Sequence, residues 1–255
     1  FVSSLVVGTS GRNPITFDNW NNSKILAYWK YDDATKPGKD SHSWLGRLNN
    51  IRTALQGQQG DRRLRLGIAG GEWKKMMADA TARTRFASEV KKIIEQYDFD
   101  GVDFDFEWPA NASEYNNYSA TVIQMRSTLG KYVYFTASLH PVSFKISPEA
   151  IDALDFISYQ CYGPAVMRFP YEQFVKDGEA AVAYGIPKNK LVMGVPFYGS
   201  TGSLIAAYCD FVNDGLATTN EDTYTYKGNT YTFNSIETIR KKARYVCEED
   251  YAGIM

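Results

Sequence analysis

Short apolar runs of strand length alternate along the chain with longer stretches whose apolar residues recur three and four positions apart. This alternation predicts a parallel sheet covered by helices, because parallel neighbours need a crossover connection. The expected strands are Val2–Gly8, Lys24–Trp29, Arg63–Ala69, Gly101–Glu107, Tyr132–Leu139, Phe156–Tyr162, Leu191–Tyr198 and one that opens at Ala252. The expected helices are Trp44–Leu55, Thr81–Tyr97, Tyr115–Leu129, Glu172–Tyr184 and Ser235–Cys247. Eight strands in this order predict an α/β fold, a (β/α)8 TIM barrel whose eighth strand is cut short at the C-terminus.

One connection is much longer than the others. Residues 200–234 separate the seventh strand from its helix, and the segment from Tyr224 to Phe233 alternates around Lys-Gly-Asn. This pattern predicts a small hairpin inserted into the barrel. No internal repeat or linker-like segment is visible, and a length of 255 residues suits one barrel. We therefore expect residues 1–255 to form a single domain, with 200–234 as its inserted segment.

Composition and charge narrow the possible partners. Lys plus Arg number 28 and Asp plus Glu number 29, so the chain lacks the basic field of a nucleic-acid binder. No apolar stretch approaches the roughly 20 residues that a bilayer span needs, so no membrane partner is expected. The three cysteines, Cys161, Cys209 and Cys247, are too few for a disulfide framework, although one bond between Cys209 and Cys247 stays open. The chain starts at Phe1 without a signal segment, as a mature form or a fragment would.

Residues 98–109 carry the most informative pattern. Asp103, Asp105 and Glu107 recur with period two, and apolar residues fill the alternate positions. On a strand, this spacing puts the carboxylates on one face and the apolar side chains on the other. In a barrel the acids would point inward, where an unpaired carboxylate costs several kcal/mol. The pattern therefore indicates chemistry rather than stability.

The spacing of the acids also predicts how they titrate. Neighbours at i and i+2 lie about 7 Å apart and, at an effective dielectric constant near 20, repel by roughly 2.4 kcal/mol, or about 1.7 pKa units. At least one member should therefore keep its proton near neutrality, as a general acid must. Glu107 is the expected acid because it lies last on the strand, nearest the mouth of the barrel, while Asp103 should lie deepest.

Three other interpretations of the acids compete with catalysis. A calcium loop needs Gly at its sixth position, whereas Gly101 is fourth from Asp98. A Mg²⁺ or Mn²⁺ site would draw ligands from several strands, and nothing else in the chain nominates them. A structural ion network would pair the acids with Arg63 or Arg65. Catalysis is the favoured interpretation.

The same residues resemble a known family. The run from Asp100 to Glu107, Asp-Gly-Val-Asp-Phe-Asp-Phe-Glu, is similar to the Asp-Gly-x-Asp-x-Asp-x-Glu signature of glycoside hydrolase family 18, the chitinases and related enzymes. The resemblance extends over the chain in order: 23–29 resembles the family's second strand, 156–162 its sixth, 190–199 its seventh and 251–255 the start of its eighth.

The resemblance implies a role for four residues. Glu107 would protonate the glycosidic oxygen, and the substrate's own N-acetyl oxygen would attack the anomeric carbon, a route outside the usual two-carboxylate scheme. Asp105 would orient the acetamido group and stabilise the oxazolinium-like intermediate, Asp103 would share a proton with Asp105, and Tyr162 would donate a hydrogen bond to the acetamido carbonyl. The family implies neither a metal nor an organic cofactor.

Further residues are expected at the rim of the site. His140 and Trp73 lie near strand ends, the histidine as a hydrogen-bonding residue rather than a catalyst and the tryptophan as a candidate for stacking on a sugar face. The residues expected to contact substrate are Trp29, Trp108, Gln160 and Tyr198.

The chain also departs from the family pattern. Gln160-Cys-Tyr-Gly163 stands where Met-x-Tyr-Asp is common, so a second sugar-contacting carboxylate is missing. Gly67-Ile-Ala-Gly-Gly71 replaces Ser-x-Gly-Gly and removes a hydroxyl that would bond the deepest aspartate, a support that an inward-pointing Arg65 would replace. Ser200 replaces an Arg. The chain stops at Met255, before the Trp that floors the family's site, so we expect either a truncated sequence or a site without that platform.

From these observations we expect a retaining endo-hydrolase of β-1,4-linked N-acetylglucosamine polymers, that is, a chitinase. Its partner would be chitin or N-acetylglucosamine oligosaccharides, and we expect a secreted monomer. One alternative is an endo-β-N-acetylglucosaminidase that cuts the chitobiose core of N-glycans, although such relatives tend to lack the pair Trp108-Pro109. The other is a chitinase-like lectin, although lectins usually lose the acid at Glu107.

Overall fold

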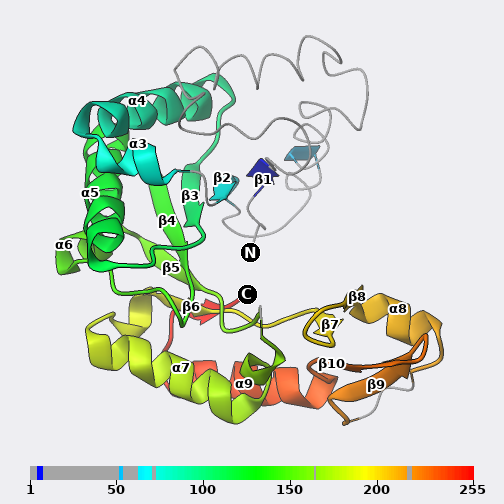
Figure 1. The fold of residues 1–255 in the computed structure, drawn as a ribbon. Helices are drawn as coiled ribbons and strands as arrows, with labels where there is room; N and C mark the ends of the chain where they lie inside the picture. Colours follow the sequence, from blue (N-terminus) through cyan, green and yellow to red (C-terminus); the bar gives the residue numbers. More distant parts are fainter. Residues whose placement is uncertain (1–4, 8–51, 54–62, 71–72, 164, 217–219) are drawn as a thin grey trace. The chain divides into compact units, whose positions relative to one another are not determined.

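The computed structural model describes residues 5–7, 52–53, 63–70, 73–163, 165–216 and 220–255 (Figure 1). The chain divides into two compact units. The N-terminal unit comprises Phe1–Thr136 and Asp152–Leu154, and the C-terminal unit comprises Ala137–Ile151 and Asp155–Met255. Strand β4 begins in the first unit and ends in the second.

The N-terminal unit is a parallel α/β arrangement. Strand β2 pairs in parallel with β1 on one side and with β3 on the other, and β4 follows β3 in the sheet. The strands are β1 (Leu5–Val7), β2 (Arg65–Gly70), β3 (Gly101–Phe106) and the start of β4 (Tyr134–Leu139). The helices are α3 (Lys74–Ala78), α4 (Ala80–Gln96) and α5 (Ala112–Leu129). Both long helices begin at a capping side chain: Asp79 accepts from the Ala82 amide and Asn111 from the Glu114 amide.

The apolar face of β3 forms the centre of this unit's core. Phe104 and Phe106 have no exposed surface, and their rings lie 5.3 and 6.0 Å from the ring of Tyr118 on α5. Phe86 of α4 packs 6.0 Å from Phe104. Because side chains alternate along a strand, fixing this face against α4 and α5 forces Asp103 and its period-two neighbours to the opposite face.

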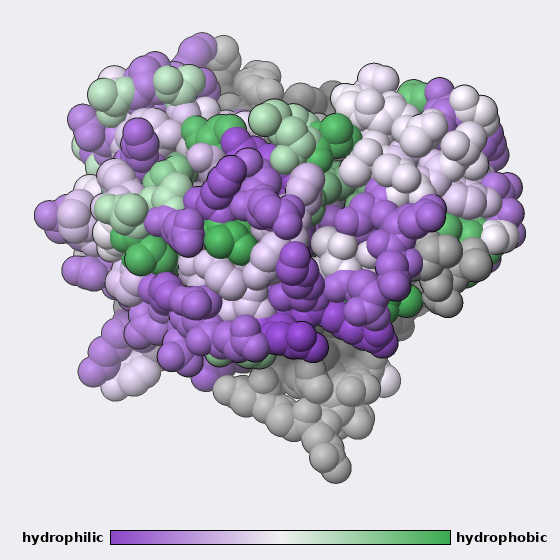
Figure 2. All heavy atoms as spheres, turned by 90° about the horizontal axis from the view of Figure 1, so that it is seen from below, coloured by the Kyte–Doolittle hydropathy of each residue, from purple (hydrophilic) through white to green (hydrophobic). Residues whose placement is uncertain are grey.

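The C-terminal unit continues the same pattern. Strand β6 pairs in parallel with β5 and with β11, and the Gln160 amide, just after β5, donates to the Leu139 carbonyl at the end of β4. The strands are β5 (Phe156–Tyr159), β6 (Leu191–Met193) and β11 (Gly253–Ile254). The helices are α6 (Pro148–Ala153), whose last residues belong to the other unit, α7 (Tyr171–Tyr184) and α9 (Ile236–Glu248), with 3-10 turns at Val166–Arg168 and Lys188–Lys190. The face of α7 and α9 seen in Figure 2 is mainly hydrophilic, as expected for helices that cover a sheet.

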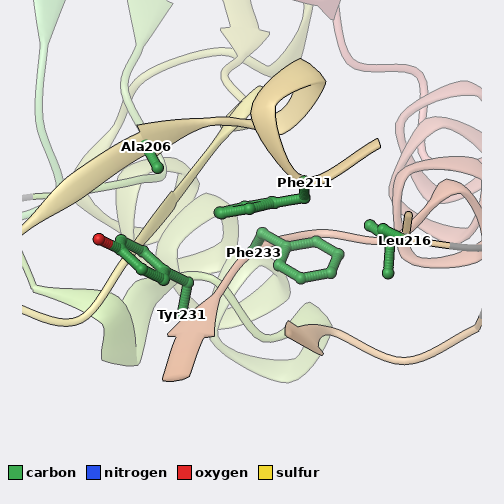
Figure 3. Close-up of a cluster of buried hydrophobic side chains, with 5 residues drawn as sticks. All are labelled: Ala206, Phe211, Leu216, Tyr231 and Phe233. Atoms are coloured by element: carbon green, nitrogen blue, oxygen red, sulfur yellow. The ribbon is translucent and has the colours of Figure 1, made fainter. Parts of the chain in front are cut away.

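Between β6 and α9 lies an antiparallel segment with its own small core. Its strands follow the order β8-β7-β10-β9. They are β7 (Tyr198–Ser200), β8 (Ile205–Ala207), β9 (Thr223–Tyr226) and β10 (Asn229–Thr232), joined by helix α8 (Tyr208–Asn213). Figure 3 shows Phe211 among the buried side chains of this core, with ring centroids 5.3 Å from Tyr231 and 5.4 Å from Phe233. Gly199 leaves room for that ring, since a Cβ there would lie 2.6 Å from it.

Most expected elements are confirmed within the described residues. The inserted hairpin forms as β9 and β10 around Lys227 and Gly228, both with positive φ, as a two-residue turn between twisted strands requires. The predicted single strand Leu191–Tyr198 is wrong: the parallel strand ends at Met193, and Tyr198 begins β7 of the second sheet. Pro196 lies in the break and has no amide to donate.

Other expectations fared differently. The short helices α3, α6 and α8 were not predicted, because five or six residues are too few to establish a helical period. The expected elements Lys24–Trp29 and Trp44–Leu55 lie outside the described residues, except for 52–53, which are helical. The cysteines Cys209 and Cys247 are free and exposed, so the disulfide left open between them does not form. Among the described helices none has the length and apolar character to cross a membrane.

The start of β3 is fixed by Asp100 and Gly101. The Asp100 amide donates to Leu64 O, its carboxylate accepts from Leu64 N at 2.6 Å, and its carbonyl accepts from Tyr134 N. These bonds tie β3 to both neighbouring strands. A Cβ at Gly101 would lie 1.9 Å from the Tyr134 carbonyl oxygen, so no larger residue fits without moving β4.

We predict that Gly101→Ala lowers the free energy of unfolding by about 3 kcal/mol, because the added methyl overlaps backbone rather than a movable side chain. Gly202→Ala is the control: φ there is +98°, but an added methyl meets nothing within 4 Å, so only backbone strain of about 1 kcal/mol is expected. Urea unfolding of both variants measures the two costs. Equal costs would contradict the steric explanation.

Candidate active site

The three acids of β3 become progressively more exposed along the strand. Asp103 is 3% exposed, Asp105 is half-buried and Glu107, just after the strand, is exposed. This order confirms that Asp103 lies deepest and Glu107 nearest solvent. The peptide bond between Glu107 and Trp108 is cis.

Arg65 points to the acid face and meets the deepest acid. The register pairs Arg65 with Gly101 and Gly67 with Asp103, so Arg65 and Asp103 share one face of the sheet. The Arg65 guanidinium lies 3.2 Å from Asp103 Oδ1, and both residues are buried. Arg65 also donates to the hydroxyl of Thr136 on β4, which donates in turn to Asp103 Oδ1. The inward Arg65 that the sequence left open is therefore present, and Thr136 is a partner that sequence analysis missed.

Among the three acids of β3, Asp105 has a pKa that is clearly raised. Burial and the neighbouring charges of Glu107 and Asp103 raise the pKa of Asp105 from its ordinary 3.8 to about 7. The sequence predicted that one acid of the column would hold a proton near neutrality, and the structure bears this out. The shift falls on Asp105 because Asp105 is half-buried and has a carboxylate on each side. The assignment of Glu107 as the general acid stays a prediction.

Tyr162 lies in a tight setting in the C-terminal unit. Its ring meets Gly194, where a Cβ would lie 2.6 Å from Tyr162 Cε1. The ring of Tyr198 stands edge-on to it, with centroids 6.4 Å apart. Gly163 has φ +46°, and a Cβ there would lie 2.9 Å from the Tyr198 hydroxyl. The two tyrosines therefore depend on glycines at positions that sequence analysis did not single out.

Tyr198 packs against Phe169, whose backbone is held by a buried lysine. The ring of Phe169 stands edge-on to Tyr198 at 5.5 Å. Lys242, which has no exposed surface, donates to Phe169 O and to Asn234 Oδ1, each at 2.7 Å. Burial lowers the pKa of Lys242 to about 8. These bonds fix the segment after β5 to the end of the inserted segment and to α9.

His140 acts as a support rather than a reacting group. It is 1% exposed, and its Nε2 lies 3.0 Å from Tyr162 O and 2.7 Å from Gly163 O. Its Nδ1 accepts from the Val142 amide, so Nε2 carries the proton and donates to the two carbonyls. His140 thus holds the backbone of Tyr162, as expected of a hydrogen-bonding histidine.

Four further aromatic or polar residues were expected near the substrate, and the structure describes three of them. Trp108 and Gln160 are half-buried, next to Glu107 and Tyr162 in the chain. Trp73 is not a stacking surface: it is 4% exposed and packs 5.3 Å from Phe86 in the core. Trp29 lies outside the described residues.

The acids are spread along one strand instead of converging on a point. Across the parts of the chain that the structure describes, no group of three His, Cys, Asp or Glu side chains is arranged to hold a metal ion. Arg65 lies beside Asp103 and brings a positive charge to the column.

Asp105 makes stability depend on pH. Because its pKa is raised in the folded state, this carboxyl stabilises the fold fully below its unfolded value of 3.8, and the stabilisation is lost as pH rises through about 7. We predict that Asp105→Asn, which cannot ionise, gains stability over the wild type between pH 4 and pH 8, by about 4 kcal/mol. Chemical unfolding at the two pH values measures this gain. Asp152→Asn, an exposed acid of α6, is the control, and an equal gain there would contradict the assignment.

Comparison with known proteins agrees with this geometry. The family model described as glycosyl hydrolases family 18 matches residues 13–255. A protein of Drosophila melanogaster named "Probable chitinase 2" is 26% identical over 189 residues, which cover 59% of this chain and 37% of that protein. The chain matches between about a third and a half of the length of the first curated relatives.

Solved structures show the fold. A chitinase from Bacteroides thetaiotaomicron superposes with a TM-score of 0.71 at 22% identity, covering 85% of this chain and 75% of that one. A family 18 chitinase from Cycas revoluta in complex with (GlcNAc)3 gives a TM-score of 0.69 at 18% identity, covering 81% and 79%. The fold is therefore the TIM barrel of these structures. With the signature acids on β3 and a family match over nearly its whole length, the chain belongs to glycosyl hydrolase family 18.

Proposed function

We propose that this chain is a chitinase: a retaining endo-hydrolase of β-1,4-linked N-acetylglucosamine polymers that uses the substrate's N-acetyl group as nucleophile. The observation that carries the proposal is the graded column on β3, from buried and paired Asp103, through Asp105 with a pKa of about 7, to exposed Glu107. Such a column supports a reaction that needs a proton donor at the solvent end and a negative charge beneath it.

Glu107 is the proton donor in the proposed reaction. It transfers its proton to the glycosidic oxygen as the bond from that oxygen to the anomeric carbon breaks. The acetamido oxygen bonds to the anomeric carbon from the opposite face and gives an oxazolinium ion. Glu107 then takes a proton from a water that attacks the same carbon, which reopens the ring. Two inversions leave the configuration retained.

Asp105 acts on the acetamido group. Its carboxyl oxygen accepts from the acetamido N–H, which orients the nucleophile, and its negative charge stabilises the positive charge that develops on the ring. A partly buried carboxylate does this without reorganising solvent. A pKa near 7 lets Asp105 exchange a proton with its surroundings under neutral conditions.

Tyr162 and four other residues complete the proposed site. The Tyr162 hydroxyl donates to the acetamido carbonyl, and the packing of its ring between Gly194 and Tyr198 supports a fixed orientation. Trp29, Trp108, Gln160 and Tyr198 are proposed to contact the sugar chain. We further propose that residues 1–255 act as one catalytic domain of a secreted monomer.

The relatives support the substrate class. The fly relative is named a chitinase, and the Cycas revoluta structure holds (GlcNAc)3. Among the alternatives, a glycosidase acting on N-glycan cores would use the same acid, and Trp108-Pro109 favours chitin over it. A lectin without activity would not need Glu107. Parallel assays on chitin oligosaccharides and on an N-glycosylated protein decide among the three.

We predict that Glu107→Gln lowers the turnover of N-acetylglucosamine oligosaccharides at least a hundredfold, roughly the smallest loss expected on removing a general acid. Binding, measured by calorimetry, should stay within a few-fold because the amide keeps the shape of the acid. Glu95→Gln, at an exposed acid of α4, is the matched control and should keep full turnover. Retained turnover in the Glu107 variant would refute its role.

The substrate-assisted route makes a second prediction. Fully deacetylated chitosan oligomers lack the internal nucleophile, so we expect cleavage at less than about 1% of the rate for acetylated oligomers of equal length. Chromatography of the products measures both rates. Rapid cleavage of deacetylated chains would show that an enzyme carboxylate or a water attacks instead.

A further inference from the structure

Arg65 is the feature of the site that the proposed chemistry leaves unused. Its residue exposure is 7%, and its guanidinium lies on the acid face of the sheet, 3.2 Å from Asp103 Oδ1. A buried guanidinium is costly unless it is paired and hydrogen-bonded, so the contact with Asp103 is a condition for Arg65 to lie there.

Thr136 closes the arrangement from the next strand. Its hydroxyl accepts a hydrogen bond from Arg65 and donates one to Asp103 Oδ1. That carboxylate oxygen thus meets a cation from β2 and a hydroxyl from β4. In both contacts Oδ1 of Asp103 is the acceptor, and the contact with Arg65 is a charge-assisted hydrogen bond.

We propose that Arg65 is a positioning residue that acts through Asp103: by pairing with the deepest acid it sets the electrostatic potential in which the carboxyl of Asp105 takes up and releases its proton. The catalytic consequence rests on the proposed function, whereas the electrostatic one does not.

The groups that face Asp105 are consistent with this assignment. On β3 it has a carboxylate on each side, Asp103 and Glu107, which together with burial raise its pKa to about 7. Tyr118 of α5 packs on the other face of β3, and burial raises the pKa of its phenol well above its ordinary value of 10, so it brings no charge to the column. Arg65 brings a positive charge to the column at Asp103, the acid on one side of Asp105.

The experiment that tests this proposal replaces Arg65 by two uncharged residues. Arg65→Met removes the charge and the hydrogen bonds, whereas Arg65→Gln removes the charge and keeps a donor. Arg65→Lys restores the charge. Arg63→Met is the matched control: it makes the same change two residues away, where the guanidinium is exposed and lies 4.4 Å from the Tyr134 ring centroid.

Two readouts are measured for each variant. The first is the pH dependence of kcat/KM on an N-acetylglucosamine oligosaccharide. The second is the carboxyl titration of Asp105, followed by NMR of protein labelled with ¹³C at Asp Cγ and assigned with Asp105→Asn. Thermal unfolding reports whether each variant is folded.

Removing the nearby positive charge makes the column bind protons more tightly. In Arg65→Met and Arg65→Gln we therefore expect the titration of Asp105 and both limbs of the kcat/KM profile to move up by about one pH unit. Arg65→Lys should return them to within a few tenths of a unit, and Arg63→Met should leave them in place. If Arg65→Met does not fold, Arg65→Gln carries the test.

A purely structural Arg65 would give a different result. The variants would unfold at lower temperature, while the Asp105 titration and the shape of the pH profile stayed as in the wild type, and this outcome would overturn the inference. If the wild type cleaves no N-acetylglucosamine oligosaccharide, the proposed function fails, and the NMR titration alone still decides the role of Arg65.

Discussion

A buried carboxyl group is stable only if it is paired with a positive charge, accepts hydrogen bonds or keeps its proton. The acids of β3 lie at different depths and meet this requirement in different ways. Asp103, the deepest, has a buried guanidinium and a hydroxyl. Asp105, one pleat further, meets the condition by keeping its proton up to a pH of about 7. Glu107 reaches solvent. Three chemically similar side chains thus have different surroundings, set by their depth and by their charged neighbours.

The residues between the acids matter for the same reason. The column stays in register because Phe104 and Phe106 fix the other face of the strand and Gly101 lets β4 approach. In the C-terminal unit, the absence of a side chain at Gly194 leaves room for the ring of Tyr162. A shift of one residue in β3 would turn every acid into the core, which no local adjustment could repair. The family signature therefore specifies backbone geometry as much as chemistry.

How much of this could be predicted from sequence depends on the range of the interactions. Period-two alternation is local, so the shared face of the acids and the hairpin at Lys227 followed from it. The partner of Asp103 did not, because it depends on which residues of β2 and β4 stand beside it. The raised pKa of Asp105 was not predicted either, since spacing gives the repulsion between acids but not their burial. The end of β6 at Met193 was missed because the apolar run continues past it.

The exchange of a hydroxyl for Arg65 changes the number of protons that the site needs. The formal charges of three carboxylates and one guanidinium sum to −2, and each proton that the column binds raises this sum by one. If a neutral hydroxyl supported Asp103 instead of Arg65, the formal sum would be −3, and the column would need one more proton to reach the same charge. A guanidinium stays charged at every pH that the fold tolerates. The chain therefore holds its site at a given charge with one fewer titrating proton, and the burial of Arg65 is the structural cost of that substitution.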